Sequence, residues 1–149
     1  MVYFRVVSGT GLDSWLVKHT TRSEFSHAEF VLPESKQAFG AYLDGVSFRP
    51  LDYAHFDREV WFTAPRIDEA LCWAVKQNGK KYDFSAIVGI FADRDWRDCN
   101  KFFCSELVAL AFERAGAPIL NPQFSPWRIT PRDILLSPVI EKVKDIRNG

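Results

Sequence analysis

The order of the expected secondary structure limits this chain to a small number of folds. Before Pro65, short apolar segments separated by turn signals predict strands and a single helix. These segments are 2–7, 12–21 (the helix), 25–32, 38–43, 46–49 and 58–63. After Pro65, helical spacing predominates, at 65–78, 83–91, 101–115 and 131–136, before a final strand at 139–146. Strands followed by helices, without regular β-α-β alternation, predict an α+β fold in which an antiparallel sheet packs against helices.

The length and composition fit one globular domain. The chain has 149 residues, of which 47% are hydrophobic and 26% are charged, close to the averages for globular proteins. Its 13 Phe, 5 Trp and 4 Tyr supply enough large side chains for a substantial core. Because the sequence contains no repeat, linker or low-complexity segment, we expect residues 1–149 to form a single domain.

Charge and hydropathy argue against several classes of partner. The 19 basic residues balance the 19 acidic ones, and Lys and Arg form no run. The chain therefore lacks the basic surface expected of a protein that binds nucleic acid or an anionic membrane. No apolar segment approaches the length that crosses a bilayer. Since residues 1–7 lack the features of a signal peptide, we expect a protein that is cytoplasmic as synthesised.

The cysteines indicate free thiols. An odd number, Cys72, Cys99 and Cys104, cannot form a closed disulfide framework. Cys99 and Cys104 have no second Cys or His pair nearby to complete a zinc site, so we expect no metal and no cofactor. Cys72 follows Leu71 on a predicted helix with no base nearby, and we expect it to pack in the core.

Cys104 lies at the expected start of the strongest helix. The residues that follow it at helical spacing are apolar, which places Cys104 at the head of the buried stripe. These residues are Leu107, Val108, Ala111 and Phe112. Unpaired backbone N–H groups and the helix dipole at such a position favour a thiolate. A small buried cysteine without a chemical role is the common alternative.

His27 is the histidine best placed to act on that thiol. It lies on the predicted strand 25–32, where alternation puts His27, Glu29 and Val31 on one face. An imidazole on a strand that faces a cysteine at a helix start is the arrangement of a Cys–His nucleophilic pair.

Three short runs resemble the circularly permuted NlpC-type cysteine peptidases, as found in bacteria and in phages or prophages. The runs are 25–32 (FSHAEFVL), 79–83 (GKKYD) and 103–108 (FCSELV). In that family a papain-like fold places the histidine strand before the cysteine helix. The resemblance therefore implies a single-domain permuted papain-like fold, with Cys104 as the nucleophile and His27 as its base.

A third polar group is needed to orient the imidazole. Many permuted relatives place an acid on the strand after the histidine strand, but here that segment, 38–43, contains none before Asp44. Glu29 lies two residues after His27 on the same strand face and is the preferred candidate, with Asp44 as the alternative. A backbone carbonyl or a water also remains open for this role.

The remaining site residues concern the oxyanion and the substrate. The backbone N–H of Cys104 and one further donor are expected to form an oxyanion hole. Tyr82 is a candidate because the related family keeps a tyrosine there, although a buried structural tyrosine explains it equally well. Trp96 lies in a charged loop and could line a substrate groove or cover the core. Asp83 is expected to cap a helix.

The resemblance implies a thiol hydrolase that cleaves an amide or peptide bond, with cell-wall peptides as the leading substrate. The lack of an export signal would then fit delivery to the wall by a phage apparatus, or a cytoplasmic substrate. Two alternatives remain: an acyltransferase or thioesterase that uses the same site, and an inert binding or phage structural protein that retains the fold.

Overall fold

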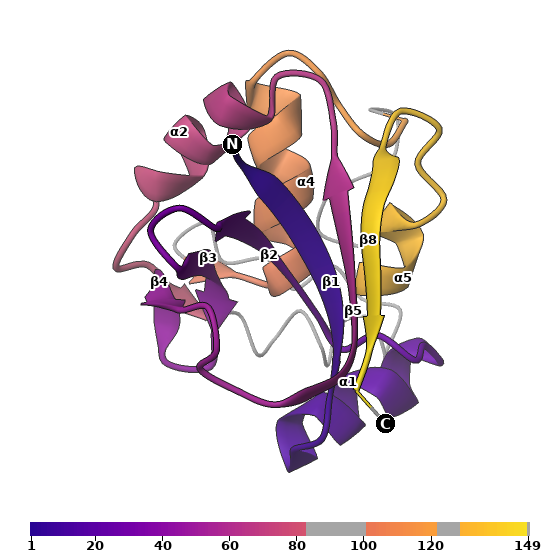
Figure 1. Ribbon diagram of the computed structural model, residues 1–149. Helices are drawn as coiled ribbons and strands as arrows, with labels where there is room; N and C mark the ends of the chain where they lie inside the picture. The colour runs from indigo at the N-terminus through magenta and orange to yellow at the C-terminus, as the bar shows by residue number, and fades with distance from the viewer. Residues whose placement is uncertain (83–100, 122–128, 149) are drawn as a thin grey trace.

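A six-stranded antiparallel sheet forms the centre of the structure, a computed structural model that describes residues 1–82, 101–121 and 129–148. The strands lie in the order β4-β3-β2-β1-β5-β8, which places β4 and β8 at the two edges (Figure 1). Their bounds are β1 Tyr3–Gly9, β2 His27–Leu32, β3 Gln37–Tyr42, β4 Gly45–Pro50, β5 Phe56–Thr63 and β8 Glu141–Arg147. Two short strands, β6 Lys81–Tyr82 and β7 Lys101–Phe102, form a separate parallel pair.

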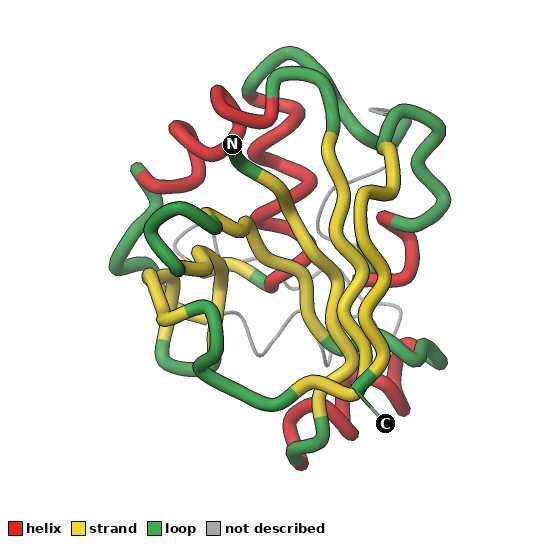
Figure 2. The backbone as a smooth tube through the Cα atoms, in the orientation of Figure 1, coloured by secondary structure: helices red, strands yellow, loops and turns green. Residues whose placement is uncertain are grey.

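The described helices are α1 Leu12–Thr21, α2 Ile67–Val75, α4 Cys104–Arg114 and α5 Pro131–Ile134. Figure 2 shows them grouped around the sheet, with α1 at the end where β1 finishes. No helix within residues 1–82, 101–121 and 129–148 is long and apolar enough to span a membrane. The predicted α+β class with an antiparallel sheet is confirmed.

An aromatic cluster joins the sheet to α4. Phe112 of α4 contacts Phe4 of β1 and Phe30 of β2, with ring centroids 5.6 and 6.0 Å apart. All three side chains are fully buried, and Phe62 of β5 stacks on Phe4 at 5.4 Å. The predicted apolar stripe of this helix is confirmed, since every residue from Cys104 to Phe112 is buried.

The other face of the sheet carries a buried charged pair. Arg5 and Glu29 are cross-strand partners in β1 and β2, adjacent to Phe4 and Phe30, so they point away from α4. The segment between β4 and β5 lies against this pair. A guanidinium nitrogen of Arg5 donates a hydrogen bond to the Leu51 carbonyl in that segment, at 3.1 Å.

The strands β2 and β3 pair along only part of their length. Their ladder joins 30–32 to 37–39, whereas β3 continues to pair with β4 as far as Tyr42. The β2 residues His27 and Glu29 therefore lie beyond the ladder, beside the part of β3 that holds Gly40 and Tyr42. The candidate site forms here.

Some helix boundaries agree with the sequence-based prediction, and others differ from it. The helix at 12–21 has the predicted bounds, whereas α4 begins at Cys104 rather than 101 because 101–102 pair with β6 instead. The predicted helix at 83–91 lies outside the described residues.

Candidate active site

The structure brings Cys104 and His27 into contact. Cys104 is the first residue of α4 and has no exposed surface. His27 is the first residue of β2, and its side chain keeps 15% of its surface exposed. Charge and hydrogen bonding from Cys104 raise the pKa of His27, so the two side chains lie close enough to interact.

The start of α4 provides a favourable environment for a negative group. Its first helical hydrogen bond runs from the Leu107 N–H to the Phe103 carbonyl at 3.0 Å, so the preceding N–H groups have no intrahelical acceptor. The Glu106 carboxylate accepts from the Phe103 N–H at 3.3 Å, which fixes the path of the chain into the helix. Cys104 therefore lies at the positive end of the helix dipole.

The electrostatics of His27 favour the imidazolium. Burial alone would lower the pKa of His27, but the charge of Cys104 and its hydrogen bond, with a smaller contribution from Glu29, raise that pKa to about 10. At neutral pH the ring therefore holds a proton while it contacts Cys104.

Glu29 is fully buried and is held by four side chains. Its Oε1 accepts from Arg5, at 2.7 Å from Nε and 2.6 Å from a terminal nitrogen. Its Oε2 accepts from the Tyr42 hydroxyl at 2.5 Å and from the Tyr53 hydroxyl at 3.3 Å, and lies 3.3 Å from His27 Nε2. The carboxylate thus fixes one imidazole nitrogen and the ring orientation.

These contacts keep Glu29 ionised. Burial would raise its pKa, but the hydrogen bond and charge of His27, the charge of Arg5 and the Tyr42 hydroxyl together lower it to about 2. Burial and the charge of Glu29 in turn raise the pKa of both Tyr42 and Tyr53 above the ordinary value. Both phenols therefore remain protonated hydrogen-bond donors.

Gly40 of β3 leaves the space that this arrangement needs. A Cβ at Gly40 would lie 3.0 Å from the Glu29 Cβ and 3.5 Å from His27 Nε2. Tyr42, two residues further along β3, stacks on the His27 ring with centroids 5.1 Å apart. The Arg49 guanidinium also lies 4.1 Å from the Tyr42 ring centre.

A cavity of about 500 Å³ opens onto the imidazole. His27, Tyr42 and Tyr53 line it together with the 9–11 turn and Tyr82. Cys104 has no exposed surface and does not belong to this lining. Among the described residues, the cavity therefore borders the imidazole and not the thiol.

The other predicted site residues have different outcomes. Asp44 does not reach the imidazole: it is 72% exposed and pairs with Arg49 at 2.6 Å, which removes it as the orienting acid. Tyr82 is buried, with its ring 6.0 Å from that of Phe103. Trp96 lies outside the described residues, as do Asp83 and Cys99. The expectation that Cys72 packs in the core is wrong, because Cys72 is exposed on the outer side of α2.

Sequence reasoning missed Arg5, Tyr42 and Tyr53. Arg5 had a signal, since it is a lone cation inside the apolar strand 2–7. A lone buried cation requires a carboxylate partner, and Glu29 is the matching acid on the next strand. Tyr42 and Tyr53 carry no such local signal, because their contacts depend on strand register and on the path of the 51–55 loop.

The described residues offer no evident metal site. Within residues 1–82, 101–121 and 129–148, no three His, Cys, Asp or Glu side chains gather in a way that could hold a metal ion. Both oxygens of Glu29 are engaged by hydrogen-bond donors, and the adjacent Arg5 cation would repel a metal.

Comparisons with known proteins define the fold alone. No family model matches the chain, and a search of curated proteins finds no match. Among solved structures, the chain is similar to that of the metalloprotein yiiX from Escherichia coli O157:H7, DUF1105. The two are 19% identical with a TM-score of 0.73, over 98% of this chain and 97% of the other.

The expected membership in the NlpC-type cysteine peptidases is therefore corrected. It depended on three runs of five to eight residues, too short to define a family, and the similar solved structure is that of a DUF1105 metalloprotein. The comparison assigns this chain an α+β fold like that of yiiX.

Proposed function

We propose that this protein is a thiol hydrolase that cleaves an amide or peptide bond through an acyl-enzyme on Cys104. The observation that carries the proposal is the contact of the Cys104 side chain with an imidazole whose Nε2 is already held by a buried carboxylate. A structural cysteine needs neither partner. A nucleophilic cysteine needs both, one to take its proton and one to orient the base.

In the proposed reaction, the Cys104 thiol has already given its proton to His27, so the resting site holds a thiolate beside an imidazolium. The thiolate Sγ attacks the carbonyl carbon, and the backbone N–H groups at the start of α4 stabilise the oxyanion. The tetrahedral intermediate collapses as His27 gives its proton to the departing amine, which leaves a thioester on Cys104. Water then attacks the thioester with His27 as base, releasing a carboxylic acid and restoring the thiolate.

Glu29 acts in this scheme through His27. Its carboxylate remains ionised throughout, since its pKa is lowered to about 2. It therefore stabilises the imidazolium formed when the thiol ionises and fixes the ring that delivers the proton. Arg5 and the two tyrosine hydroxyls hold Glu29 in place without touching the reacting atoms.

We also propose that the fold is a permuted papain-like arrangement, because a histidine strand precedes a cysteine helix and the helix packs against that strand's sheet. The substrate we propose is a peptide, including peptides derived from peptidoglycan. The cavity at His27 supports an extended acyl group, because aromatic rings and the 9–11 backbone line it.

The similarity to yiiX, a metalloprotein, raises metal binding as another activity. The Glu29 surroundings do not fit it: Arg5 is only 1% exposed and ion-paired to that carboxylate, and a cation would compete with it. The proposed reaction therefore uses no metal ion.

Binding without catalysis is the second candidate function, favoured by the complete burial of the Cys104 side chain. In that case the thiol would be a core residue, and the cavity at His27 would hold a ligand without covalent chemistry.

Alkylation by iodoacetamide separates the two functions. In a background with Cys72 and Cys99 replaced by Ser, Cys104 should react at pH values well below the free-thiol pKa of about 8.5. His27→Ala should abolish that low-pH rate. His55→Ala is the matched control, since His55 lines the same cavity outside the Glu29 network, and it should leave the rate unchanged.

A rate that follows an ordinary thiol in all three proteins would exclude the hydrolase and leave the binding function. If the activated thiol is found, a screen of peptide and cell-wall fragments for release of a new amine should give turnover in the parent protein and none in Cys104→Ser.

A further inference from the structure

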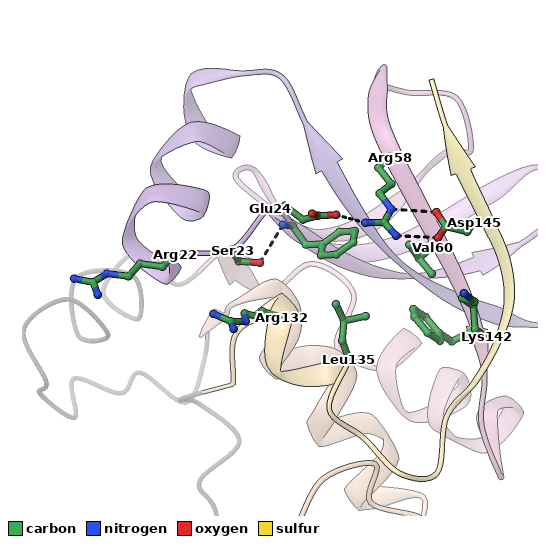
Figure 3. Close-up of a pocket in the computed structure, with 11 residues that line it drawn as sticks. Arg22, Ser23, Glu24, Arg58, Val60, Arg132, Leu135, Lys142 and Asp145 are labelled. Atoms are coloured by element: carbon green, nitrogen blue, oxygen red, sulfur yellow. Dashed lines mark hydrogen bonds and ion pairs between the residues drawn. The ribbon is translucent and has the colours of Figure 1, made fainter. Parts of the chain in front are cut away.

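A second cavity, of about 550 Å³, shares no lining residue with the one at His27 (Figure 3). Its walls come from the 22–25 segment after α1 and from β5, α5 and β8. We propose that it binds a small organic anion in which a phosphate or carboxylate group is attached to an apolar body.

The floor of the cavity fits the apolar part. Phe25, Val60 and Phe62 are 3% to 5% exposed, and Leu135, the residue that follows α5, lies across the cavity from Val60 (Figure 3). Because those three residues are already almost fully buried, an apolar group would gain most by covering the half-buried Leu135.

Both acidic residues of the lining are paired with one arginine. Arg58 binds both Asp145 oxygens, at 3.1 and 2.8 Å, and also pairs with Glu24. Its guanidinium lies over the Phe25 ring, 5.4 Å from the centroid. The hydrogen bond to Arg58 holds the pKa of Asp145 below its ordinary value, so this carboxylate remains paired at neutral pH.

The remaining basic residues of the lining are available to a ligand. Within the described parts of the chain, Arg22, Arg132 and Lys142 make no hydrogen bond or ion pair through their side chains. Figure 3 shows Arg132 and Lys142 at opposite ends of the cavity, with Leu135 between them, whereas Arg22 extends away. With four basic and two acidic lining residues, the cavity is positive although the chain as a whole is neutral.

An irregularity in β8 directs charged side chains to this cavity. Asp145 pairs with Val60, and Lys142 pairs with Phe62, so both flank residues of the cavity floor. In a regular strand, residues three apart would point to opposite faces, but the register shifts between Trp61 and Phe62. Lys144, opposite Trp61, instead lies 5.1 Å from the Trp61 ring, outside the cavity lining.

Titration of the whole chain with 2-naphthyl phosphate, followed by naphthyl fluorescence anisotropy, tests the proposal. Saturable binding is expected, and the double variant Arg132→Gln, Lys142→Gln should weaken it at least about tenfold, because it removes the two charged donors. Lys144→Gln is the matched control on the same strand and should stay within about twofold, since Lys144 is absent from the lining. Circular dichroism of each variant shows whether the fold is retained.

Three further ligands separate the contribution of the anionic group from that of the apolar body. We expect 2-naphthol and inorganic phosphate each to bind at least about tenfold more weakly than 2-naphthyl phosphate, since each lacks one half of the recognised group. 2-Naphthoate, compared with the phosphate, identifies which anion is preferred. No saturable binding, equal binding of 2-naphthol, or a folded double variant that binds like the parent would overturn the proposal. Cys104→Ser should bind as the parent does, whatever the outcome at His27.

Discussion

Replacing Glu29 by Gln tests the buried charge network directly. Gln has nearly the same shape, so Glu29→Gln removes the charge and leaves the packing largely intact. Arg5, which is 1% exposed, would then face one carboxylate, Glu59, instead of two. A buried cation that loses part of its compensation destabilises the folded state.

The expected cost follows from the carboxyl pKa. Folding lowers the pKa of Glu29 from 4.5 to about 2, which corresponds to about 3 kcal/mol of stability at pH 7. Because the folded pKa is the lower one, this contribution is complete above pH 4.5 and is lost as the pH falls towards 2. By pH 3, roughly half of it is gone.

Urea unfolding followed by tryptophan fluorescence at pH 7 and pH 3 measures the difference. Glu29→Gln should be less stable than the parent by about 3 kcal/mol at pH 7, and the gap should shrink by roughly half at pH 3. Glu34→Gln is the control, because Glu34 is exposed in its ion pair with the amino terminus. A gap below about 1 kcal/mol at pH 7, or one independent of pH, would refute the reasoning.

Three further substitutions extend the test. Folding raises the pKa of His27 from 6.5 to about 10, so its contribution to the free energy of unfolding is complete below pH 6.5 and is lost as the pH rises towards 10. In urea titrations, His27→Ala should therefore make the free energy of unfolding less dependent on pH between 6.5 and 10. Gly40→Ala, whose methyl would lie 3.0 Å from the Glu29 Cβ, should cost about 1–3 kcal/mol and slow Cys104 alkylation; unchanged alkylation would contradict the tight fit. Phe112→Ala should cost about 3–5 kcal/mol by urea unfolding, because it empties the space between Phe4 and Phe30; a loss below about 1 kcal/mol would mean the cluster repacks.

Local periodicity predicts much of this fold. The bounds of α1 and the buried stripe of α4 follow from the spacing of apolar residues along a single element. The side-by-side position of His27 and Glu29 follows in the same way, because residues two apart share a strand face. The exposure of Cys72 is consistent with helical spacing, since the buried residues of α2, Ile67, Ala70, Leu71 and Ala74, lie on another face.

Contacts between distant segments could not be predicted in this way. Tyr42 and Tyr53 reach Glu29 because of where β3 lies beside β2 and because of the path of the 51–55 loop. Neither event has a periodic signal. The pairing of β6 with β7 is equally hidden, because two residues are too few to show alternation.

The side chains that hold Glu29 have a consequence for the timing of assembly. Arg5, Tyr42, Tyr53 and His27 all precede α2, so during synthesis they leave the ribosome before Cys104 does. Every side chain that holds Glu29 is therefore synthesised before Cys104, whereas the edge strand β8 is synthesised after it. Under the proposed function, the residues that orient the imidazole would all precede the nucleophile in the chain.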